Sequence, residues 1–398
     1  MPWKTRTPVD MRMEFIQRLA KDERLTDLCR EYGISRKTAY KFKERFERRG
    51  AAGLQDGSRA PHVIPHKTAP ELEALIVAER RRHPTWGPRK LKSLLEKRFG
   101  RAFPSPATIG NIVQRHGLAQ PRKKRVRYER PEAFAVLGEA LKPNDVWCID
   151  YKGQFRLGDA TYCYPLTLTD QYSRFILGCE GMAAISDEAA RDVCEEAFST
   201  HGLPLVIRSD NGAPFASRGL AGLTKLSVFW LRLGIGLERT RPGHPQDNGR
   251  HERMHRTLKF ETARPARANL LQQQERFDAF VEEFNTERPH EALDMKRPAD
   301  LYRRSPRSAP SRLPDLRYPA HDDVVRVNAY GQIYIAGLGQ APLSVALAGN
   351  DVGIREERDG RWLVTFADLD LGHIGKDKRI TPIDNAPPER LVRCNPCA

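Results

Sequence analysis

Long apolar runs and cysteines are both scarce in this chain of 398 residues. No run approaches the roughly 18 apolar residues of a membrane-spanning helix, and the N-terminus lacks the apolar stretch of a secretory signal. The seven cysteines are odd in number and lie mostly inside apolar stretches, which argues for reduced, buried thiols and against a disulfide framework. These absences predict a soluble cytoplasmic protein with no membrane partner.

Paired zinc ligands are also missing. Cys394 and Cys397 form one CxxC pair at the tail, and no second pair of suitable spacing accompanies it. Four zinc ligands cannot be assembled from this pair, so we predict no zinc site there.

Acidic residues are depleted in one part of the chain only. Residues 1–130 hold 32 Lys and Arg against 14 Asp and Glu, whereas the remainder holds 35 basic and 37 acidic residues. The net charge of +16 therefore comes entirely from the first third. A basic segment joined to a near-neutral body indicates binding to a polyanion such as DNA.

Two helical modules occupy this basic region. In the first, residues 1–60, a short helix, a turn at Gly33 and a third helix capped by Ser35 are typical of a helix-turn-helix. The third helix carries candidate DNA contacts off its apolar stripe, namely Arg36, Lys37, Lys41 and Arg45. A solvated three-helix bundle is the alternative, and the local positive charge favours DNA.

The second module, residues 61–120, repeats this pattern, with helices expected to start at Pro88 and Pro106. Arg89 and Lys90 are predicted at the exposed start of its middle helix and are candidate DNA contacts. Residues 121–143 form a basic linker.

From Asn144 the pattern changes to strands and helices in the order strand-strand-strand-helix-strand-helix-strand-helix. This order predicts a mixed sheet flanked by helices over residues 144–302. A Pro/Arg-rich linker (303–320), short strands typical of a small β-barrel (321–385) and a tail (386–398) follow. The fold class is thus multidomain α+β.

Three acidic residues have unusual contexts within the mixed-sheet region. Asp150 lies in a strand otherwise fit for burial, where an ionised carboxylate is costly without a compensating cation. Asp210 closes a short strand and precedes Asn211-Gly212, and strand ends often carry catalytic groups. Glu252 begins a helix whose opposite side, with Met254 and Leu258, is fit to pack.

Such a set suits the chemistry of DNA phosphodiesters. Cleaving or transferring one requires an activated oxygen nucleophile and stabilisation of the leaving oxygen, which two divalent ions about 4 Å apart can supply. Mg²⁺ prefers hard oxygen ligands, so a few carboxylates suffice. Arg256 and Lys259, on the Glu252 side of the helix, are candidate contacts to DNA phosphates.

Four ordered motifs resemble those of the DDE transposases of bacterial insertion sequences. They are Trp147-Cys-Ile-Asp150-Tyr-Lys152, Ser209-Asp210-Asn211-Gly212, residues 244–259 around Glu252, and Phe284-Asn285 with Arg288-Pro289-His290 through Leu293. The resemblance covers Asp145 to about Tyr302. It implies a retroviral-integrase-like, RNase H-like core, with Asp150, Asp210 and Glu252 as catalytic ligands of two Mg²⁺ or Mn²⁺ ions.

Two features depart from the integrase pattern. Asp210 and Glu252 are separated by 41 residues, a longer interval than is typical, and the surplus is expected as a surface insertion over Ala216–Trp230. His62 and His66 have the His spacing of the integrase zinc site, but no CxxC follows before the core, so again we predict no zinc.

Other polar residues near the motifs are weighed as supporting groups. Asp170, Asn211 and Asn248 are candidates to contact and orient the metal ligands, although a strand-end Asp such as Asp170 more often caps a turn. Asp159 and Asp247 are interpreted as turn residues.

The sequence therefore predicts a transposase that binds the terminal inverted repeats of its own element and catalyses strand cleavage and strand transfer. Its partners would be double-stranded DNA, both element ends and target, and further copies of itself on that DNA, in the bacterial cytoplasm at the nucleoid. A DNA-binding regulator with an inactive core and a simple nuclease of RNase H-like fold are the alternatives.

Overall fold

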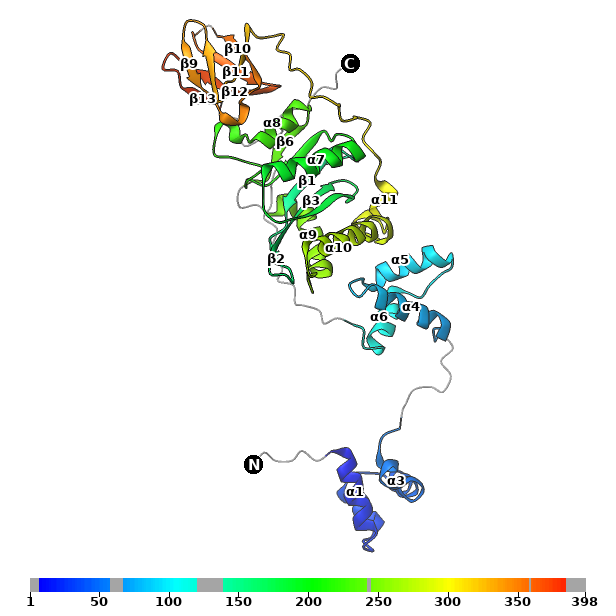
Figure 1. Cartoon of the computed structure of the whole chain (residues 1–398). Coiled ribbons are helices and arrows are strands. Elements are labelled where there is room, and N and C mark those ends of the chain that lie inside the picture. The colour runs from blue at the N-terminus through cyan, green and yellow to red at the C-terminus, as the bar shows by residue number, and fades with distance from the viewer. Residues whose placement is uncertain (1–6, 58–66, 120–138, 242–244, 358, 384–398) are drawn as a thin grey trace. The chain divides into compact units, whose positions relative to one another are not determined.

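The computed structural model describes residues 7–57, 67–119, 139–241, 245–357 and 359–383 (Figure 1). Two compact units make up the chain, Met1–Ala69 and Pro70–Ala398. His62, His66, Cys394 and Cys397, which bear on the zinc prediction, lie outside the described residues, as does most of the predicted basic linker. No helix in the described ranges is both long and apolar enough to cross a membrane.

The first unit contains the three predicted helices, α1 (Pro8–Leu19), α2 (Leu25–Glu31) and α3 (Arg36–Arg49). The Ser35 side chain accepts a hydrogen bond from the backbone N–H of Thr38 at 3.2 Å and so caps α3 as predicted. Gly33 adopts φ +63°, a left-handed conformation that suits glycine, in the turn between α2 and α3. The helices enclose a small apolar core of Phe15, Ile16, Leu28, Cys29, Ala39 and Leu54.

The second unit begins with α4 (Pro70–Arg82), α5 (Pro88–Phe99) and α6 (Pro106–Arg115). Pro88 and Pro106 start their helices as predicted, because proline lacks the N–H that a first helical residue leaves unpaired. Trp86, Leu91, Leu95 and Ile109 are almost fully buried between the three helices.

A mixed six-stranded sheet follows, formed by β1 (Val146–Tyr151), β2 (Phe155–Arg156), β3 (Tyr162–Asp170), β4 (Ile176–Met182), β5 (Val206–Ser209) and β6 (Gly236–Arg239). Across the sheet, β4 pairs β3, β3 pairs β1, and β1 continues to β5 and β6, while β2 extends along the start of β3. The β1–β3 and β3–β4 pairs are antiparallel, and the β1–β5 and β5–β6 pairs are parallel. The predicted mixed sheet is therefore confirmed.

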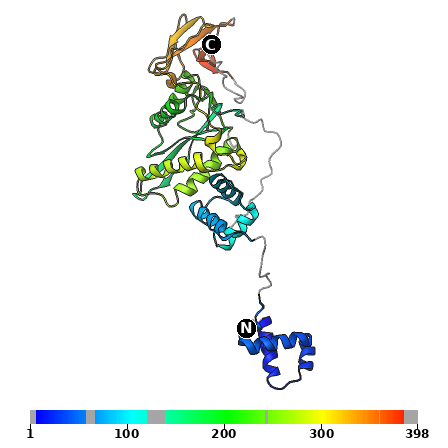
Figure 2. The same ribbon diagram turned by 90° about the vertical axis from the view of Figure 1, so that its right-hand side faces the viewer.

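Helices cover both faces of this sheet (Figures 1 and 2). Residues that alternate along β1 and β3 separate the layers: Trp147, Ile149 and Leu168 pack with α7 (Asp187–His201) and α8 (Lys225–Arg232). The opposite face receives α9 (Gly249–Thr262) and α10 (Leu270–Glu282), which run side by side. The sequence did not predict α10 or the π-helical turn that extends it over Glu283–Glu287.

Two expectations about the periphery were wrong or unsupported. The segment Ala216–Trp230 is not a surface insertion throughout, because Leu223, Leu226 and Trp230 are buried where α8 enters the core. The predicted C-terminal barrel is not confirmed, because the described strands form an open five-stranded antiparallel sheet, β13–β12–β11–β10–β7, and a separate β8–β9 hairpin. These strands are β7 (Asp323–Arg326), β8 (Gln332–Ile335), β9 (Gly339–Pro342), β10 (Asp351–Glu356), β11 (Trp362–Phe366), β12 (Leu369–Ile374) and β13 (Ile380–Pro382).

The Pro/Arg-rich segment after residue 302 is bonded to the core at its start. The Leu203 N–H donates to the carbonyl of Arg307 at 2.7 Å, and the Ser305 N–H donates to the carbonyl of His201 at 2.9 Å. The Arg307 guanidinium also donates to the carbonyl of Gly234 at 2.8 Å. This part of the segment therefore acts as a strap that follows the core surface.

Candidate active site at the ends of two parallel strands

Asp150 and Asp210 occupy equivalent positions on neighbouring parallel strands. The β1–β5 register pairs Val146 with Val206 and Cys148 with Arg208. Continuing that register by two residues places Asp150 beside Asp210, across strands spaced about 4.8 Å apart. Both carboxylates therefore leave the sheet at the same edge.

The loop after β5 is held in place on both sides of Asp210. The Asp210 Oδ1 atom accepts a hydrogen bond from the Gly212 N–H at 3.1 Å, which closes a tight turn. The Asn211 side chain donates to the carbonyl of Thr240, at the end of β6. Asn211 thus ties two strand ends together beside Asp210.

Glu252 is carried to this edge by α9, in whose first turn it lies exposed. The turn that enters α9 is anchored by two arginines. Arg208, almost fully buried and paired with Glu238 at 2.7 Å, donates to the carbonyl of Asp247 at 3.3 Å. Arg241 pairs with the Asp247 carboxylate at 2.7 Å. Asp247 therefore has the turn role that was predicted for it.

Two buried histidines dock α9 onto the sheet. Thr167, which is paired with Asp150 in the β1–β3 register, has its Oγ1 atom 2.7 Å from Nε2 of His251 and 2.6 Å from Nε2 of His255. The Oγ1 atom of Thr169 lies 2.8 Å from Nδ1 of His251. These contacts fix both the rotation and the height of α9, and with it Glu252.

The carboxylates act on one another electrostatically. Burial is the largest cause that raises the pKa of Asp150 to about 7, and the negative charges of Asp210 and Glu252 raise it further, whereas Lys152 and a backbone N–H lower it. Asp210 and Glu252 are thus both close enough to Asp150 for their charges to act on it, while the role of the three as metal ligands stays a prediction. Carboxylate oxygens are the hard donors that Mg²⁺ prefers, and a cation bound between them would offset their negative charge.

A second grouping with metal-ligand chemistry lies at the same place. Ligand atoms of Asp150, His251 and His255 lie within 4.8 Å of one another. Both ring nitrogens of His251, however, contact threonine hydroxyls, and Nε2 of His255 contacts Thr167. A metal on this grouping would have to break the contacts that dock α9, so the all-carboxylate set fits better.

The two histidines and Thr167 are residues that the sequence analysis did not assign a role. Both histidines are almost fully buried, and burial lowers the pKa of His251 to about 3 and that of His255 still further. Their i, i+4 spacing around Glu252 was the available signal, because it places both on one face of the helix.

The three candidate supporting residues have different surroundings. Asp170 accepts hydrogen bonds from the backbone N–H of Asn144 and from both the N–H and the hydroxyl of Ser173, at 2.6–2.7 Å, and so closes the β3–β4 turn. It pairs with Trp147, three residues and about 10 Å along the strand from Asp150, and its bonds fit the turn-capping alternative, while a supporting role at the metal stays a prediction. Asn211 lies beside Asp210, and Asn248 is buried at the start of α9.

Among the remaining turn residues, Asp159 behaves as predicted. Its Oδ1 atom accepts hydrogen bonds from both the N–H and the hydroxyl of Thr161, at 2.9 and 2.6 Å.

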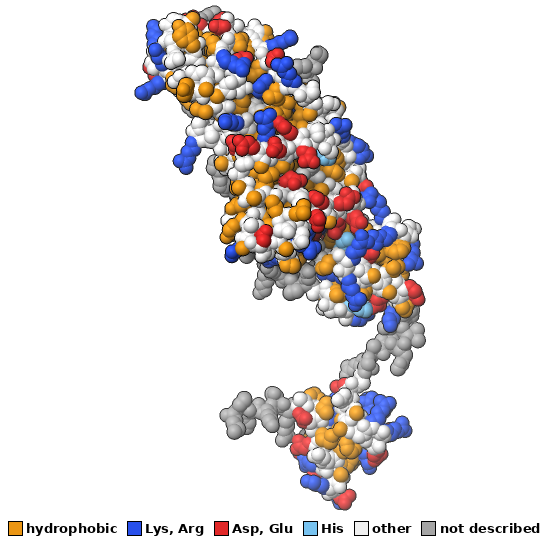
Figure 3. Space-filling model, viewed as in Figure 1, with side chains coloured by type: hydrophobic (Ala, Val, Ile, Leu, Met, Phe, Trp, Pro, Cys, Tyr) orange, Lys and Arg blue, Asp and Glu red, His pale blue; other side chains and the backbone are white. Residues whose placement is uncertain are grey.

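The predicted DNA contacts on α3 are largely free to meet a ligand. Arg36, Lys37 and Lys41 are exposed, and Arg45 is half-buried with its guanidinium 6.0 Å from the Phe42 ring centre. Figure 3 shows Lys and Arg side chains gathered on the side of the first unit that α3 forms.

The contacts predicted in the second unit differ from one another. Arg256 is exposed and Lys259 half-buried, one and two turns beyond Glu252. Arg89 is exposed, 3.6 Å from Glu291. Lys90 is not at an exposed helix start as predicted, because α5 turns it toward α9 and the 283–293 segment.

The last sequence motif joins the helical module to the sheet. The Asn285 side chain accepts from the N–H and donates to the carbonyl of Ile176, both at 2.9 Å. Arg288, buried, pairs with Glu261 at 3.0 Å, and the hydroxyl of Thr85 donates to the same carboxylate at 2.6 Å. This motif therefore braces α9 and α10 against α4 and α5.

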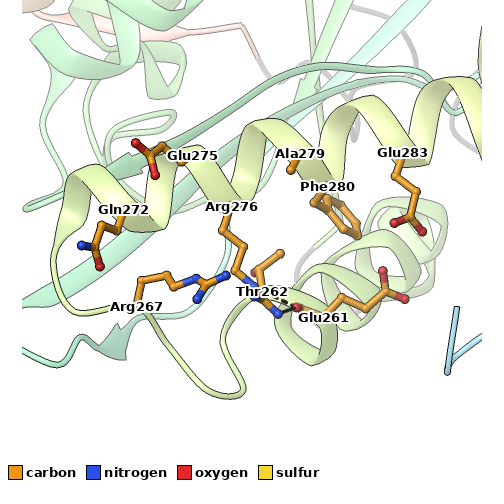
Figure 4. Close-up of a pocket in the computed structure, with 9 residues that line it drawn as sticks. All are labelled: Glu261, Thr262, Arg267, Gln272, Glu275, Arg276, Ala279, Phe280 and Glu283. Carbon is orange, nitrogen blue, oxygen red and sulfur yellow. Dashed lines mark hydrogen bonds between the residues drawn. The ribbon is translucent and has the colours of Figure 1, made fainter. Parts of the chain in front are cut away.

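A hollow of about 590 Å³ opens between the end of α9 and α10 (Figure 4). Glu261 and Arg276 line it, and the Arg276 guanidinium donates to the backbone carbonyl of Glu261 at 2.6 Å. Glu261 lies nine residues, or about 13 Å of helix, beyond Glu252, so this hollow is separate from the carboxylates.

Domain families match most of the described chain. Residues 140–245 and 233–298 each match an integrase core domain. Residues 11–62 match a helix-turn-helix domain, and residues 38–113 match a homeodomain-like domain.

Individual relatives come from mobile elements and retroviruses. The chain is 28% identical over 190 residues to the transposase for insertion sequence element IS904 of Lactococcus lactis. The matched region covers 45% of this chain and 69% of that protein. It is 30% identical over 200 residues to the Gag-Pol polyprotein of baboon endogenous virus, which covers 48% of this chain and spans only 10% of the polyprotein.

Among solved structures, the HTLV-2 integrase catalytic core domain in complex with magnesium matches 40% of this chain and 97% of its own, with 17% identity and a TM-score of 0.32. The chain thus contains helix-turn-helix domains followed by an integrase core domain, and its relatives are insertion-element transposases and retroviral Pol integrases.

Proposed function

We propose that this chain is a transposase that binds the terminal inverted repeats of its own element and transfers their strands to target DNA. An integrase core domain and transposase relatives indicate a polynucleotidyl transferase of the DDE type. The observation that carries the proposal is the register that sets Asp150 beside Asp210, with Glu252 near enough for its charge to act on Asp150.

The three carboxylates are proposed as the ligands of two Mg²⁺ or Mn²⁺ ions. The pKa of Asp150 is raised first by burial and then by the charges of Asp210 and Glu252, and a bound cation would offset both effects, which supports this assignment. Bound there, the ions would supply activation of the attacking oxygen and stabilisation of the leaving 3′ oxygen.

The chain's own residues would align the DNA at this edge. Asp150 and Asp210 stand on rigid strand ends, and Glu252 is fixed through the contacts of His251 and His255 with Thr167. Arg256 and Lys259 would hold the DNA backbone next to the carboxylates without entering the metal site, because they follow Glu252 along the same side of α9.

Recognition of the element ends is assigned to the helix-turn-helix domains. On α3, Arg36, Lys37 and Lys41 are exposed on one helix and could enter the major groove. We further propose that the chain works as a multimer, because two ends must be held for joining. We also propose the domain boundaries given by the sequence analysis, which are 1–60, 61–120, 121–143, 144–302, 303–320, 321–385 and 386–398.

A joining assay separates the transposase from a simple nuclease or an inactive regulator. Duplexes with pre-cut 3′ ends, copied from the DNA on either side of the coding sequence, are incubated with the full chain, Mg²⁺ and a supercoiled plasmid. We expect wild-type protein to join them to the plasmid and Glu252→Gln to bind but not join. Cleavage without joining by the wild type would favour the nuclease, and equal joining by both would overturn the assignment of Glu252.

A further inference from the structure

A second, smaller hollow lies on the other side of α9 from Glu252, with a volume of about 110 Å³. It is enclosed by α9, the β3–β4 turn, α5 and the segment after the π-helical turn. Arg253, Thr257 and Arg250 face it from α9, at about 100° to 160° around the helix from Glu252. The hollow is therefore distinct from the carboxylate site.

Positive charge dominates the lining of this hollow. Its cationic side chains come from four segments and are Lys90, Arg174, Arg250, Arg253 and Arg288. Asp170 is the one carboxylate in the lining, and its oxygens already accept bonds from Asn144 and Ser173. Arg288 is paired with Glu261, and Arg250 contacts Glu139 at 3.3 Å, which leaves three cations without an ion pair among the described residues.

Two buried nitrogens in the lining have no hydrogen-bond partner within the described part of the chain. They are Nη1 of Arg174 and Nε2 of His290. Buried polar atoms are nearly always bonded, and a buried nitrogen of a charged group without an acceptor is costly. An anion in the hollow would provide the missing acceptor for Arg174.

The electrostatics point the same way. Burial first, and then the nearby charges of Arg250 and Arg253, lower the pKa of Arg174 to about 10. Burial and Arg288 lower the pKa of Lys90 to about 8. Cations that disfavour one another's charge in this way leave a positive potential for a negative group to neutralise.

We propose that this hollow binds one phosphate group of a DNA strand. The choice of DNA as the source of the phosphate rests on the proposed function, whereas the anion site itself does not. The volume suits a single tetrahedral oxyanion, and arginine forks match phosphate oxygens.

The test measures DNA affinity over a series of salt concentrations with the full chain. Arg174→Asn removes the charge while keeping a residue that tolerates the left-handed backbone at this position, where φ is +67°. Losing one phosphate contact should reduce the slope of log K against log salt by about 0.9. Lys90→Gln, on a different element, should reduce it by a similar amount, and Arg174→Lys should restore most of it.

Arg191→Gln is the control, because Arg191 is exposed on α7 and already paired with Glu195. Its slope should equal that of the wild type. An unchanged slope in a folded Arg174→Asn protein would overturn the proposal, as would a loss in Arg191→Gln of the same size.

Inorganic phosphate, titrated without DNA, distinguishes the two sources of the anion. If phosphate raises the melting temperature of the wild type but not of Arg174→Asn while the DNA slopes stay equal, the hollow takes free phosphate and the DNA assignment is wrong. A reduced slope in Arg174→Asn would support the hollow even where wild-type joining fails, so this inference and the proposed transposase activity can fail separately.

Discussion

The Nδ1 atom of His255 lies 3.6 Å from Oδ2 of Asp150. Its other ring nitrogen contacts Thr167, which in turn contacts His251, which contacts Thr169. One direction of proton donation along this chain, from Thr169 through His251 and Thr167 to His255, leaves an N–H of His255 pointing at Asp150. If Thr167 donated its single proton elsewhere, to His251 or to the Asp150 carbonyl at 3.2 Å, His255 would turn a lone pair toward the carboxylate. The first arrangement is therefore favoured when Asp150 is ionised.

This relationship predicts that His255 orients Asp150 for metal binding. His255→Leu and Thr167→Val should each raise the Mg²⁺ concentration for half-maximal joining by about 10- to 100-fold, the usual effect of removing a group behind a metal ligand. His255→Asn, which keeps an N–H donor, should lose less. Thr286→Val is the control, because the Thr286 hydroxyl donates to the carbonyl of Glu282 within its own helical segment. Equal loss in the Asn and Leu variants would show that His255 only fills space.

Mg²⁺ should stabilise the protein through the carboxylate site. A ligand at one hundred times its dissociation constant stabilises the folded state by about 2.7 kcal/mol. We expect Mg²⁺ to raise the melting temperature of the wild type, and Asp150→Asn and Asp210→Asn to abolish most of that increase. Differential scanning fluorimetry with and without EDTA measures it. Asp192→Asn, an exposed acid on α7, should respond like the wild type, and a full response in Asp210→Asn would contradict the site.

The acidic residues at the strand ends could be predicted from sequence, whereas the side-chain contacts that position them could not. Asp150 and Asp210 are visible because a carboxylate at the end of an apolar strand is a local pattern. His255 becomes informative only once Thr167 is known to lie beside Asp150, which depends on the register of another strand.

Packing between elements also explains the errors in the sequence predictions. Lys90 looks exposed on its own helix, and only the docking of α5 against α9 turns it inward. The insertion over Ala216–Trp230 was predicted from the interval between Asp210 and Glu252, and chain spacing cannot show that residues 226–231 are buried in α8. α10 was missed because polar Gln and Glu residues surround the few buried side chains such as Phe277 and Phe280.

Glu180 on β4 should make stability depend on pH. Burial and the charges of Asp278 and Glu196 raise its pKa from 4.5 to about 7. The folded protein therefore holds this proton more tightly than the unfolded chain, so its stabilising contribution is complete below pH 4.5 and is lost as the pH rises through about 7. Glu180→Gln should be more stable than the wild type at pH 8, by about 1 kcal/mol after solvent screening, and not at pH 4. Urea unfolding at the two pH values measures this, and an equal difference at both would contradict it.

The ion pair between buried Arg288 and partly buried Glu261 should hold the second helical module against the core. Its N–O distance is 3.0 Å, and the hydroxyl of Thr85 completes the contact from the α4–α5 turn. Arg288→Met leaves the Glu261 carboxylate with only the Thr85 hydroxyl as a partner, and since Glu261 is partly exposed the cost should fall below the roughly 3–5 kcal/mol of a fully buried pair. Arg326→Gln, which breaks an exposed pair with Asp351, should cost less than about 1 kcal/mol. Urea midpoints of the two variants compare the losses directly. Glu261→Gln removes the charge that Arg288→Met leaves without its partner, so the double variant should recover part of the lost stability. A double variant no more stable than Arg288→Met alone would mean that the arginine acts through its packing and not through this pair.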